Sequence, residues 1–547
     1  MAQPPNGTDL PEPSSTKPPA TSAGEDERRR ITGRAGIVAL GTLASRLLGL
    51  VRDQVLAAVF TRAATDAFFV AFTIPNVLRQ LLAEGAIQSA VLPVLSRTRE
   101  QEGEAAAKRF FAAARGLSLT ILLGVSVAGV VFAPELVELF ASGFKDIPGQ
   151  FERTVSLTRW VFPYIFFMGT AALGVAALNT HQRFVVTSFA PALLNVAFIA
   201  CALGLTGWLI SRGEEPILAM AIGALVGGLL QVVAQWPSLR AIGYLTAPRF
   251  EAAHPGIREV LRRMGPVLFG IGVYAIDVLV ARRLLSELPV GSQSYFTFAQ
   301  RLCDFPQGIF VMALQTATLP SLSLLVARGD RVEVERTFAF GMRLSLFVGL
   351  PATLLLVFLA EPIVVAIFQR GEFGALAAEQ TARALMAQGA GIWTVAAVRQ
   401  LVAVYYALGD TKTPVLVATI DFLIFFGSAV WLREALGHIG VSLAVAIAST
   451  AQMLLLWTLL RRRLDRVCVG EIALSAGRTL LAAVPAGVAA ALWAHVSTPL
   501  FGTGPLLRIF PGVTAAGVFA AVFLSLAALV KSEELTTLIA AVRRRRG

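Results

Sequence analysis

Apolar stretches long enough to cross a bilayer recur along the chain from Gly36 onward, with short polar breaks between them. A hydrocarbon core about 30 Å thick requires roughly 20 residues of α-helix. The pattern therefore predicts an all-α integral membrane protein with about fourteen transmembrane helices. The predicted helices begin at Gly36, Asp66, Phe111, Ser156, Val185, Pro216, Val260, Ser294, Phe338, Ala382, Thr413, Gly440, Ala473 and Leu507.

The composition agrees with this pattern. Of the 547 residues, 56% are apolar and 15% are charged, whereas about a quarter of the residues in soluble domains are charged. The composition therefore argues against a water-soluble enzyme. The net charge of +12 is expected to come from Lys and Arg in cytoplasmic loops that face anionic membrane lipids, and not from a nucleic-acid surface.

No cofactor and no metal site is predicted. The cysteines Cys201, Cys303 and Cys468 are far apart in the chain, so they are expected to be small buried hydrophobes. The four histidines lie in or beside loops without the spacing of metal ligands. The chain has no GxxxxGK(S/T) loop, so ATP is not expected to be the direct energy source.

The distribution of loop charge predicts the orientation. If the N-terminus is inside, roughly 28 Lys and Arg residues fall in inside segments and about 7 in the opposite loops, which places both termini in the cytoplasm. Residues 1–33 are rich in Pro, Ser, Thr and Gly, and they are expected to form a disordered cytoplasmic tail and not a signal peptide. Residues 533–547 are expected to form a basic cytoplasmic tail.

An internal repeat predicts the architecture. Phe132–Phe144 resembles Leu359–Phe373, and Leu92–Ser96 resembles Leu319–Ser323, both at an offset of about 228 residues. A duplication of this kind predicts two pseudo-symmetric six-helix lobes, residues 34–250 and 251–470, around a central cavity. The arginines described below would make this central cavity cationic. Residues 471–532 would then contain two extra helices. Because such halves rock about a central site, the architecture favours transport over catalysis.

The first predicted span contains three charged residues, Arg46, Arg52 and Asp53. An arginine at the centre of a transmembrane helix costs about 2.5–3.5 kcal/mol on insertion scales, so each needs water, a partner or a ligand. Arg46 and Asp53 share a helical face, and Arg52 lies about 120° away. A break near Gly49 would turn both arginines toward one cavity. The alternative is an Arg46–Asp53 pair with Arg52 as an anchor at the helix end.

The second span combines a proline with polar side chains. Pro75 is expected to kink the helix, and just beyond it Asn76 and Arg79 lie on one face. Glu84 is a candidate to neutralise Arg79. The alternative is a polar seam between helices with a purely structural role.

Charged residues also lie inside spans of the second half. Arg301 and Asp304 are three residues apart and can pair on the helix surface. Asp277 and Asp421 are candidates for binding a coupling monovalent cation or a proton, or else they meet Arg282 or each other. Arg46, Arg52, Arg79 and Arg301 together give positive charge in both halves. Because the guanidinium fork matches phosphate, the substrate is expected to be a phosphate-bearing amphiphile.

The same stretches resemble the MurJ (MviN) lipid II flippases of the multidrug/oligosaccharidyl-lipid/polysaccharide exporter superfamily. The resemblance covers the chain from about Arg34 to the last helix. The matching stretches are Ser45–Asp53 (SRLLGLVRD), Thr65–Ala86 (TDAFFVAFTIPNVLRQLLAEGA), Ala177–Phe184 (ALNTHQRF), Arg301–Gly308 (RLCDFPQG) and Leu408–Pro414 (LGDTKTP).

The resemblance implies two lobes around a V-shaped cationic cavity, with a hydrophobic groove formed by the last two helices. It implies a flippase that moves lipid II, the undecaprenyl-diphosphate-linked peptidoglycan precursor, across the bacterial plasma (inner) membrane for cell wall biogenesis and cell shape. Contact with other cell-wall synthesis proteins would accompany this role. The implied substrate-binding residues are Arg46, Arg52, Arg79, Arg301, Ser45, Asn76 and Ser294, and the implied gating or charge-partner residues are Asp53, Asp66, Glu84 and Asp304.

Gln300 and Asp304 stand where the family commonly has other acidic residues around its second-half arginine, and the family's sodium site does not align clearly with Asp277 or Asp421. The energy source therefore stays open between the membrane potential and a monovalent ion.

Two alternative functions also stay open. One is a flippase for another polyprenyl-linked oligosaccharide. The other is an integral membrane glycosyltransferase or polymerase, which would need a catalytic acid on a sizeable extracytoplasmic loop. The predicted outside loops at Phe140–Arg153 and Glu361–Gln380 are small and carry little that suggests catalysis.

Overall fold

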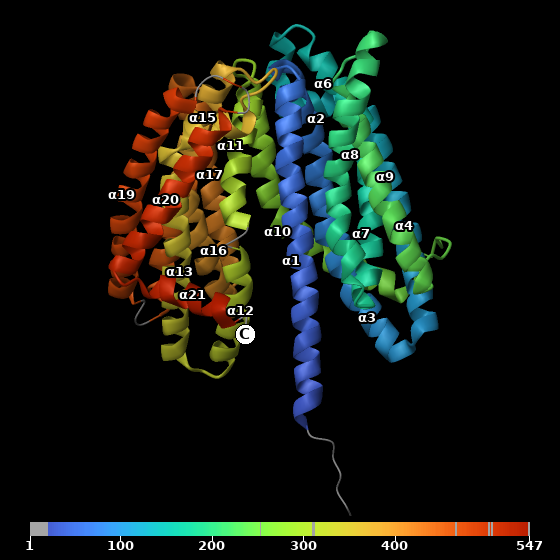
Figure 1. The fold of residues 1–547 in the computed structure, drawn as a ribbon. Helices are drawn as coiled ribbons and strands as arrows, with labels where there is room; N and C mark the ends of the chain where they lie inside the picture. The colour runs from blue at the N-terminus through green and yellow to red at the C-terminus, as the bar shows by residue number, and fades with distance from the viewer. Residues whose placement is uncertain are drawn as a thin grey trace, which may run out of the picture.

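The computed structural model describes residues 20–251, 253–308, 312–464, 468–501, 504 and 507–544. Within these residues the regular structure is helical, and Figure 1 shows the helices in two groups with α1 between them. The first half comprises α1 (Ala20–Val59), α2 (Arg62–Arg79), the π-helix η1 (Gln80–Ile87), α3 (Gln88–Glu102), α4 (Glu104–Val131), α5 (Ala133–Ala141), the 3₁₀-helix η2 (Ser142–Asp146), α6 (Gln150–Val161), α7 (Tyr164–Thr180), α8 (Phe184–Ser211) and α9 (Leu218–Ala241).

The second half comprises α10 (Pro255–Ser286), α11 (Ser292–Pro306), α12 (Met312–Ala327), α13 (Arg331–Phe358), α14 (Ala360–Phe368), α15 (Ala375–Gly389), α16 (Ile392–Ala407), α17 (Lys412–Leu436) and α18 (His438–Leu460). The chain continues with α19 (Val469–Phe501), α20 (Ile509–Leu529) and α21 (Glu533–Arg544).

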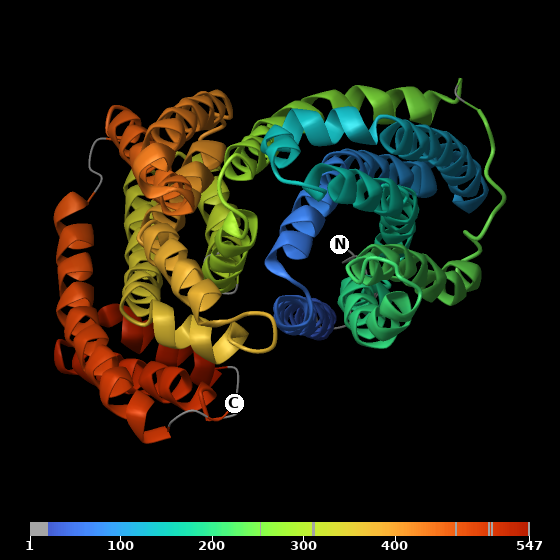
Figure 2. The same ribbon diagram turned by 90° about the horizontal axis from the view of Figure 1, so that it is seen from above.

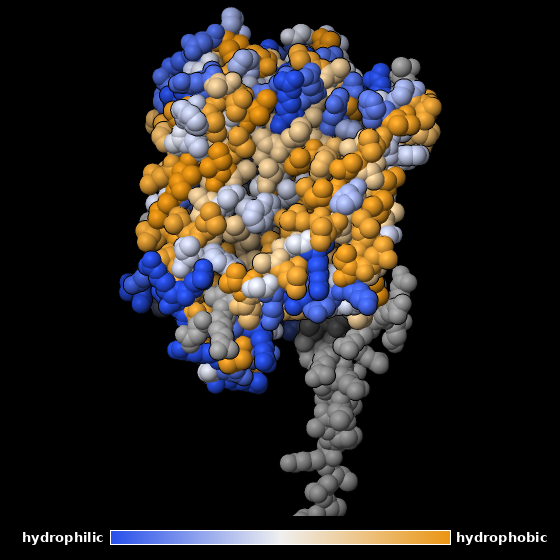
Figure 3. All heavy atoms as spheres, turned by 90° about the vertical axis from the view of Figure 1, so that its left-hand side faces the viewer, coloured by the Kyte–Doolittle hydropathy of each residue, from blue (hydrophilic) through white to orange (hydrophobic). Residues whose placement is uncertain are grey.

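Nine helical segments of the described chain are long and apolar enough to cross a membrane. They coincide with nine of the predicted starts, and Figure 3 shows hydrophobic residues across the middle of one face with hydrophilic residues at its two ends. The other predicted starts, at Gly36, Asp66, Val260, Ser294 and Ala382, also lie in helices. Helix α1 falls short in apolar character because it carries Arg46, Arg52 and Asp53, and α11 and α15 are short. The all-α membrane fold is confirmed, whereas the total of fourteen spans stays a prediction.

The helix pattern repeats at the offset seen in the sequence. Helices α4 and α13 both have 28 residues, and each is followed by a nine-residue helix, α5 or α14. A π-helical distortion begins at Gln80 in the first half and at Gln307 in the second. The shared lengths and distortions support a duplicated unit, and Figure 2 shows the two groups side by side from above.

Helix α10 belongs to both groups. It packs against η1, α3 and α5 of the first half and against α11 and α17 of the second. Figure 2 shows it running along one side of the first group before it reaches the second. The predicted boundary at residue 251 therefore falls before a helix that the two lobes share.

Helix α1 begins at Ala20, inside the segment 1–33 that is expected to form a disordered cytoplasmic tail. The tail stays a prediction. Residues 1–19 of the predicted tail lie outside the described residues. The basic C-terminal segment predicted from residue 533 is helical as α21 up to Arg544, and residues 545–547 also lie outside the described residues.

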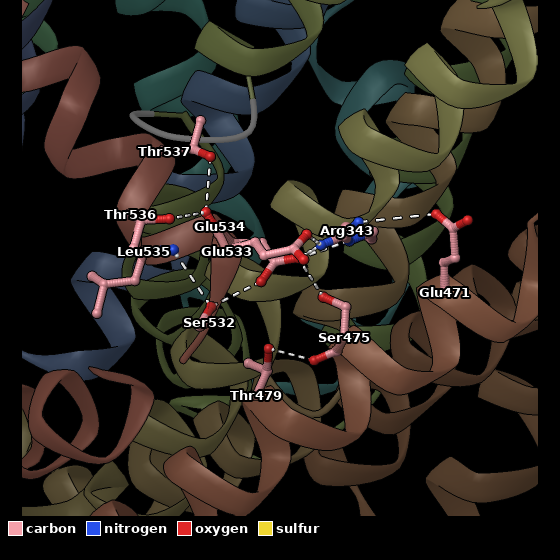
Figure 4. A network of polar contacts seen from close by, with 10 residues as sticks. All are labelled: Arg343, Glu471, Ser475, Thr479, Ser532, Glu533, Glu534, Leu535, Thr536 and Thr537. Atoms are coloured by element: carbon pink, nitrogen blue, oxygen red, sulfur yellow. Dashed lines mark hydrogen bonds and ion pairs between the residues drawn. The ribbon is translucent and has the colours of Figure 1, made fainter. Parts of the chain in front are cut away.

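The last helices pack onto the second lobe. Helix α19 contacts α13 and α20, and α20 contacts α14, around a core that includes Phe347, Ala486 and Phe519. Helix α21 is fixed by ion pairs that Figure 4 shows, in which Arg343 of α13 reaches Glu534 at 2.7 Å and Glu533 at 2.5 Å. Helix α21 is therefore bound to the lobe and does not trail from it.

Candidate functional site at the junction of the lobes

A buried carboxylate on α1 is shared by arginines from the two lobes. The Nε and Nη2 of Arg52 donate to Asp53 Oδ1 at 2.9 and 2.7 Å. The other oxygen, Asp53 Oδ2, lies 3.6 Å from the Nε of Arg301 on α11, and the Asp53 side chain is only 3% exposed. Asp53 therefore joins the first lobe to the second through a single acid.

Helix α8 holds Arg52 from the other side. Arg52 Nη1 donates to Asn195 Oδ1 at 3.1 Å, and its guanidinium lies 5.5 Å from the centre of the Phe198 ring. Asn195 in turn donates to the backbone carbonyl of Ser45 at 3.0 Å. These contacts fix the position of Arg52 while its side chain stays 15% exposed. Asn195 is not selected from the sequence. A lone amide in an apolar span could have indicated it, because a polar side chain inside the membrane needs a hydrogen-bond partner.

The side chain of Arg46 on α1 reaches α11 at a second point of the junction. Its Nη1 donates to the backbone carbonyl of Asp304 at 3.3 Å. Its guanidinium lies so close to Gly308 that a Cβ at that position would overlap it. The expected break near Gly49 is wrong, because α1 runs through this residue without interruption. The alternative Arg46–Asp53 pair is also wrong, because Asp53 binds Arg52 instead.

Asp304 is the second acid of the junction. The charges of Arg301 and Arg46 act on it, as does the charge of Arg399 on α16. Arg399 was missed in the sequence, although an arginine in an apolar span satisfies the criterion that selected the other arginines. Arg46, Arg52, Arg301 and Arg399 outnumber the acids Asp53 and Asp304, so this group of residues carries surplus positive charge.

Arg79 lies on α2, at the point where the helix gives way to the π-helix η1. Its Nε donates to Asn76 Oδ1 at 3.0 Å, as expected for two residues on one face beyond Pro75. The side chain of Glu84, predicted to neutralise Arg79, lies outside the described residues. The contacts above bring Arg46, Arg52 and Arg301 together, and Arg79 lies beside Asn76 on the neighbouring helix.

The end of the junction opposite the N-terminal end of α1 is closed by Asp66 of α2. Asp66 accepts hydrogen bonds from the backbone N–H of Gly291 at 2.6 Å and of Ser294 at 2.8 Å, and from the Ser294 hydroxyl. Asp66 and Ser294 are 2% and 1% exposed. A carboxylate from one lobe thus caps the first turn of α11 in the other. Ser294, predicted to bind substrate, is in this conformation buried in a contact between the lobes.

Arg282 of α10 lies beside this contact and was not singled out as a site residue. It is buried and donates to Gln293 Oε1 at 3.0 Å and to Thr297 Oγ1 at 2.7 Å. Its guanidinium also lies 5.9 Å from the Phe69 ring of the first lobe. Arg282 therefore supports the turn of α11 that Asp66 caps.

A loop of the second lobe closes over the end of α1. The N–H of Glu372 donates to the carbonyl of Ala58 at 3.0 Å, and Arg62 Nη1 donates to the carbonyl of Glu372 at 3.1 Å. Gly371 has φ of +55°, and a Cβ there would collide with the Ala58 carbonyl. Glycine is required at this contact because of both the backbone conformation and the close approach.

Asp277 and Asp421 form a separate acidic pair. Helix α10 packs against α17, and the charge of Asp421 acts on Asp277. The Oδ1 atom of each is buried and accepts no hydrogen bond from a described residue. The sequence left open whether these acids meet Arg282 or each other. Arg282 binds Gln293 and Thr297, so the two acids interact with each other instead. Among the described residues there is no cluster of three or more His, Cys, Asp or Glu side chains.

The fold and the arginine junction define a two-lobed integral membrane transporter. The family model described as lipid II flippase MurJ matches residues 56–512. The chain belongs to the MurJ lipid II flippase family, a family of transporters and not of enzymes, which confirms the resemblance seen in the motifs.

Curated relatives and solved structures agree with this assignment. The lipid II flippase MurJ of Burkholderia cenocepacia is 35% identical over 427 residues, covering 77% of this chain and 82% of the relative. A probable lipid II flippase MurJ of Vibrio cholerae is 35% identical over 441 residues, covering 78% and 82%. A structure of lipid II flippase MurJ in an inward closed conformation matches with a TM-score of 0.71 at 23% identity, covering 89% and 98%.

An inward-facing multidrug resistance MATE family transporter of the MOP superfamily matches with a TM-score of 0.64 at 14% identity, covering 78% of this chain and 98% of that one. These two structures establish similarity of fold.

Proposed function

We propose that this protein translocates lipid II, the undecaprenyl-diphosphate-linked disaccharide-pentapeptide, from the cytoplasmic to the outer leaflet of the bacterial inner membrane. The observation that carries the proposal is the junction where Arg52 and Arg301, from different lobes, share the single carboxylate of Asp53. A diphosphate offers acceptor oxygens to both guanidinium groups at once, and such charge-assisted contacts are strong where water is scarce.

The proposed mechanism is alternating access. The lobes are joined by Asp66 at one end and by the loop at Glu372 over the end of α1. The head group would enter from the opposite end, where the N-terminal end of α1 lies, and bind the arginines. Separation of the Asp66 and Glu372 contacts would then release it on the outer side. This direction of transport requires both termini to lie on the cytoplasmic side, as the loop charges predict.

The prenyl chain would stay in lipid beside α19 and α20. Both helices expose apolar side chains, including Leu481, Leu492 and Leu529. Keeping the chain in lipid avoids the cost of hydrating a long hydrocarbon, which is about 0.8 kcal/mol for each CH₂ group. The substrate would be made at one face of the membrane and used at the other. We therefore include in the proposal that the protein contacts the cell-wall synthesis proteins that supply and consume this substrate.

Two energy sources are compatible with the residues present. A membrane potential acts on any charge that moves through it, at about 2.3 kcal/mol per elementary charge per 100 mV. The half-buried pair Asp277 and Asp421 would bind a monovalent cation or a proton, because each has a buried Oδ1 atom that accepts no hydrogen bond from a described residue, and two such carboxylates attract positive charge. A cation bound there would link α10, which touches both lobes, to α17.

The test is depletion of the protein in cells, followed by a leaflet-resolved measurement of lipid II. We expect accumulation in the cytoplasmic leaflet, restored by the wild-type chain and not by Arg52→Ala. Unchanged lipid II with accumulation of another polyprenyl-linked oligosaccharide would assign a different cargo. Polymerisation of lipid-linked sugar by the purified protein would replace the transporter with the glycosyltransferase alternative.

A further inference from the structure

A second basic site lies away from the central arginines, between α3 and the first turns of α10. A cavity of about 830 Å³ opens there, with Ser89 and Ala90 on one wall and Arg258 and Arg262 on the other. Its volume lies within the range of small-molecule sites. The central arginine junction does not use these residues.

Among the described residues, the acid that lines this cavity is Glu259, and it is already neutralised. Glu259 accepts from Arg97 Nη1 of α3 at 3.0 Å and from Arg97 Nη2. It also accepts from the Nε and Nη2 of Arg263 at 3.0 and 2.8 Å. Two arginines thus share Glu259 and tie α3 to α10, so Glu259 has little charge left to offer Arg258 and Arg262.

Arg258 and Arg262 are exposed residues that line the cavity, and neither makes an ion pair with a described residue. They are four positions apart on α10, so they lie on one helical face, about 5–6 Å apart at Cβ. Two forked cations at this spacing match the oxygens of a diphosphate, each fork taking one phosphate group.

The cavity is connected to the central site by a single short element. Its α3 wall begins directly after η1, and η1 begins directly after Arg79. Helix α10 packs along η1 as well as α3. Along the chain, the α3 wall of the cavity is therefore separated from Arg79 by the eight residues of the π-helix.

We propose that this cavity is a first docking position for the diphosphate of the lipid-linked substrate, occupied before the head group reaches the arginines around Asp53. This inference rests on the proposed flippase function. A resident anionic phospholipid presents similar phosphate chemistry, so the test must separate the two sources.

The test measures binding of undecaprenyl diphosphate and of phosphatidylglycerol to the purified full-length protein by native mass spectrometry. In R258A/R262A we expect the affinity for undecaprenyl diphosphate to fall at least about tenfold, with phosphatidylglycerol retention unchanged. R258K/R262K keeps the charge and loses the fork, so it should restore only part of the affinity. The control R461A/R462A removes two exposed arginines from the end of α18 and should change the affinity less than about twofold.

Flipping in vesicles supplies the second measurement. If the cavity captures substrate, R258A/R262A should raise the half-saturating lipid concentration about tenfold and leave the maximal rate within about twofold of wild type. A loss of phosphatidylglycerol with unchanged undecaprenyl diphosphate binding would overturn the inference. Unchanged binding in R258A/R262A together with lost binding in Arg301→Ala would refute the docking position and leave the flippase proposal standing. Unchanged binding in both variants would count against the flippase proposal itself.

Discussion

The carboxylate of Asp53 on α1 and the guanidinium of Arg301 on α11 approach to 3.6 Å across the junction of the two lobes. The same carboxylate binds Arg52 at 2.7 Å, so one acid balances two cations from opposite halves of the chain. Under the proposed function, a bound diphosphate would compete with Asp53 for these arginines. This competition would let the site bind a highly charged group and still release it.

Asp53→Asn tests this competition. The amide keeps the size of the side chain and removes the charge, so Arg52 and Arg301 lose their shared counter-ion. We expect undecaprenyl diphosphate binding to be equal or tighter than in wild type, and the flipping rate to fall at least about tenfold because release is slowed. Arg301→Ala, in contrast, should weaken binding. Weaker binding by Asp53→Asn would mean that Asp53 positions the arginines instead of competing with the ligand.

Asp66→Ala should open the closed end of the junction. The substitution removes the acceptor for three hydrogen bonds from Gly291 and Ser294, two of them from backbone N–H groups at the start of α11. Spin labels at the exposed residues Leu139 and Leu376, in a background without the three cysteines, should report a larger population of long distances. Ser294→Ala keeps both backbone donors and should cause a smaller shift. An equal shift in both variants would contradict the capping role of Asp66.

The acidic pair predicts a specific response to cations. Asp277→Asn or Asp421→Asn removes one of two half-buried like charges, so the melting temperature without added cation should rise. If the pair binds sodium, addition of sodium chloride should stabilise the wild-type protein more than the same concentration of choline chloride. Neither Asn variant should show this difference. A sodium response that survives in both variants would place the cation elsewhere.

Arg343→Ala should release α21. Arg343 is 18% exposed and binds Glu534, which is 5% exposed and also accepts from Ser475 Oγ at 2.8 Å. Removing the cation leaves a buried carboxylate without its charge partner, which costs about 3–5 kcal/mol for a fully buried pair and less here. We expect faster hydrogen exchange in α21, measured by mass spectrometry. In Arg336→Ala, a control near the start of α13, exchange in α21 should stay unchanged.

Asp410 predicts a dependence of stability on pH. Hydrogen bonds from Thr413 hold the pKa of its carboxyl below the usual range, with a further contribution from Arg463, whose Nη2 lies 2.8 Å away. A carboxyl with a lowered pKa stabilises the fold above its ordinary value of about 4, and this stability is lost as the pH falls further. The melting temperature of wild type should therefore exceed that of Asp410→Asn at pH 7, and the difference should shrink below about pH 4. A constant difference would exclude this ionic contribution.

Several charged residues of the junction can be recognised in the sequence because charge inside an apolar span is costly and therefore conspicuous. Arg46, Arg52 and Arg301 stood out on this criterion, and Arg399 satisfied it without being selected. The partner of each arginine was harder to predict. Helical periodicity places Cβ atoms, whereas an arginine side chain is long enough to reach a neighbour off its own face, as Arg52 reaches Asp53.

The membrane-spanning helices, the repeat and the family could be derived from the chain alone, since each depends on local hydropathy or on motifs a few residues long. The contact between Asp53 and Arg301 and the cap that Asp66 places on α11 could not, because they join residues more than 200 positions apart. Nothing local encodes how two similar lobes face each other. That arrangement depends on the packing of α1, α10 and α11 as a whole, and it decides which charges meet.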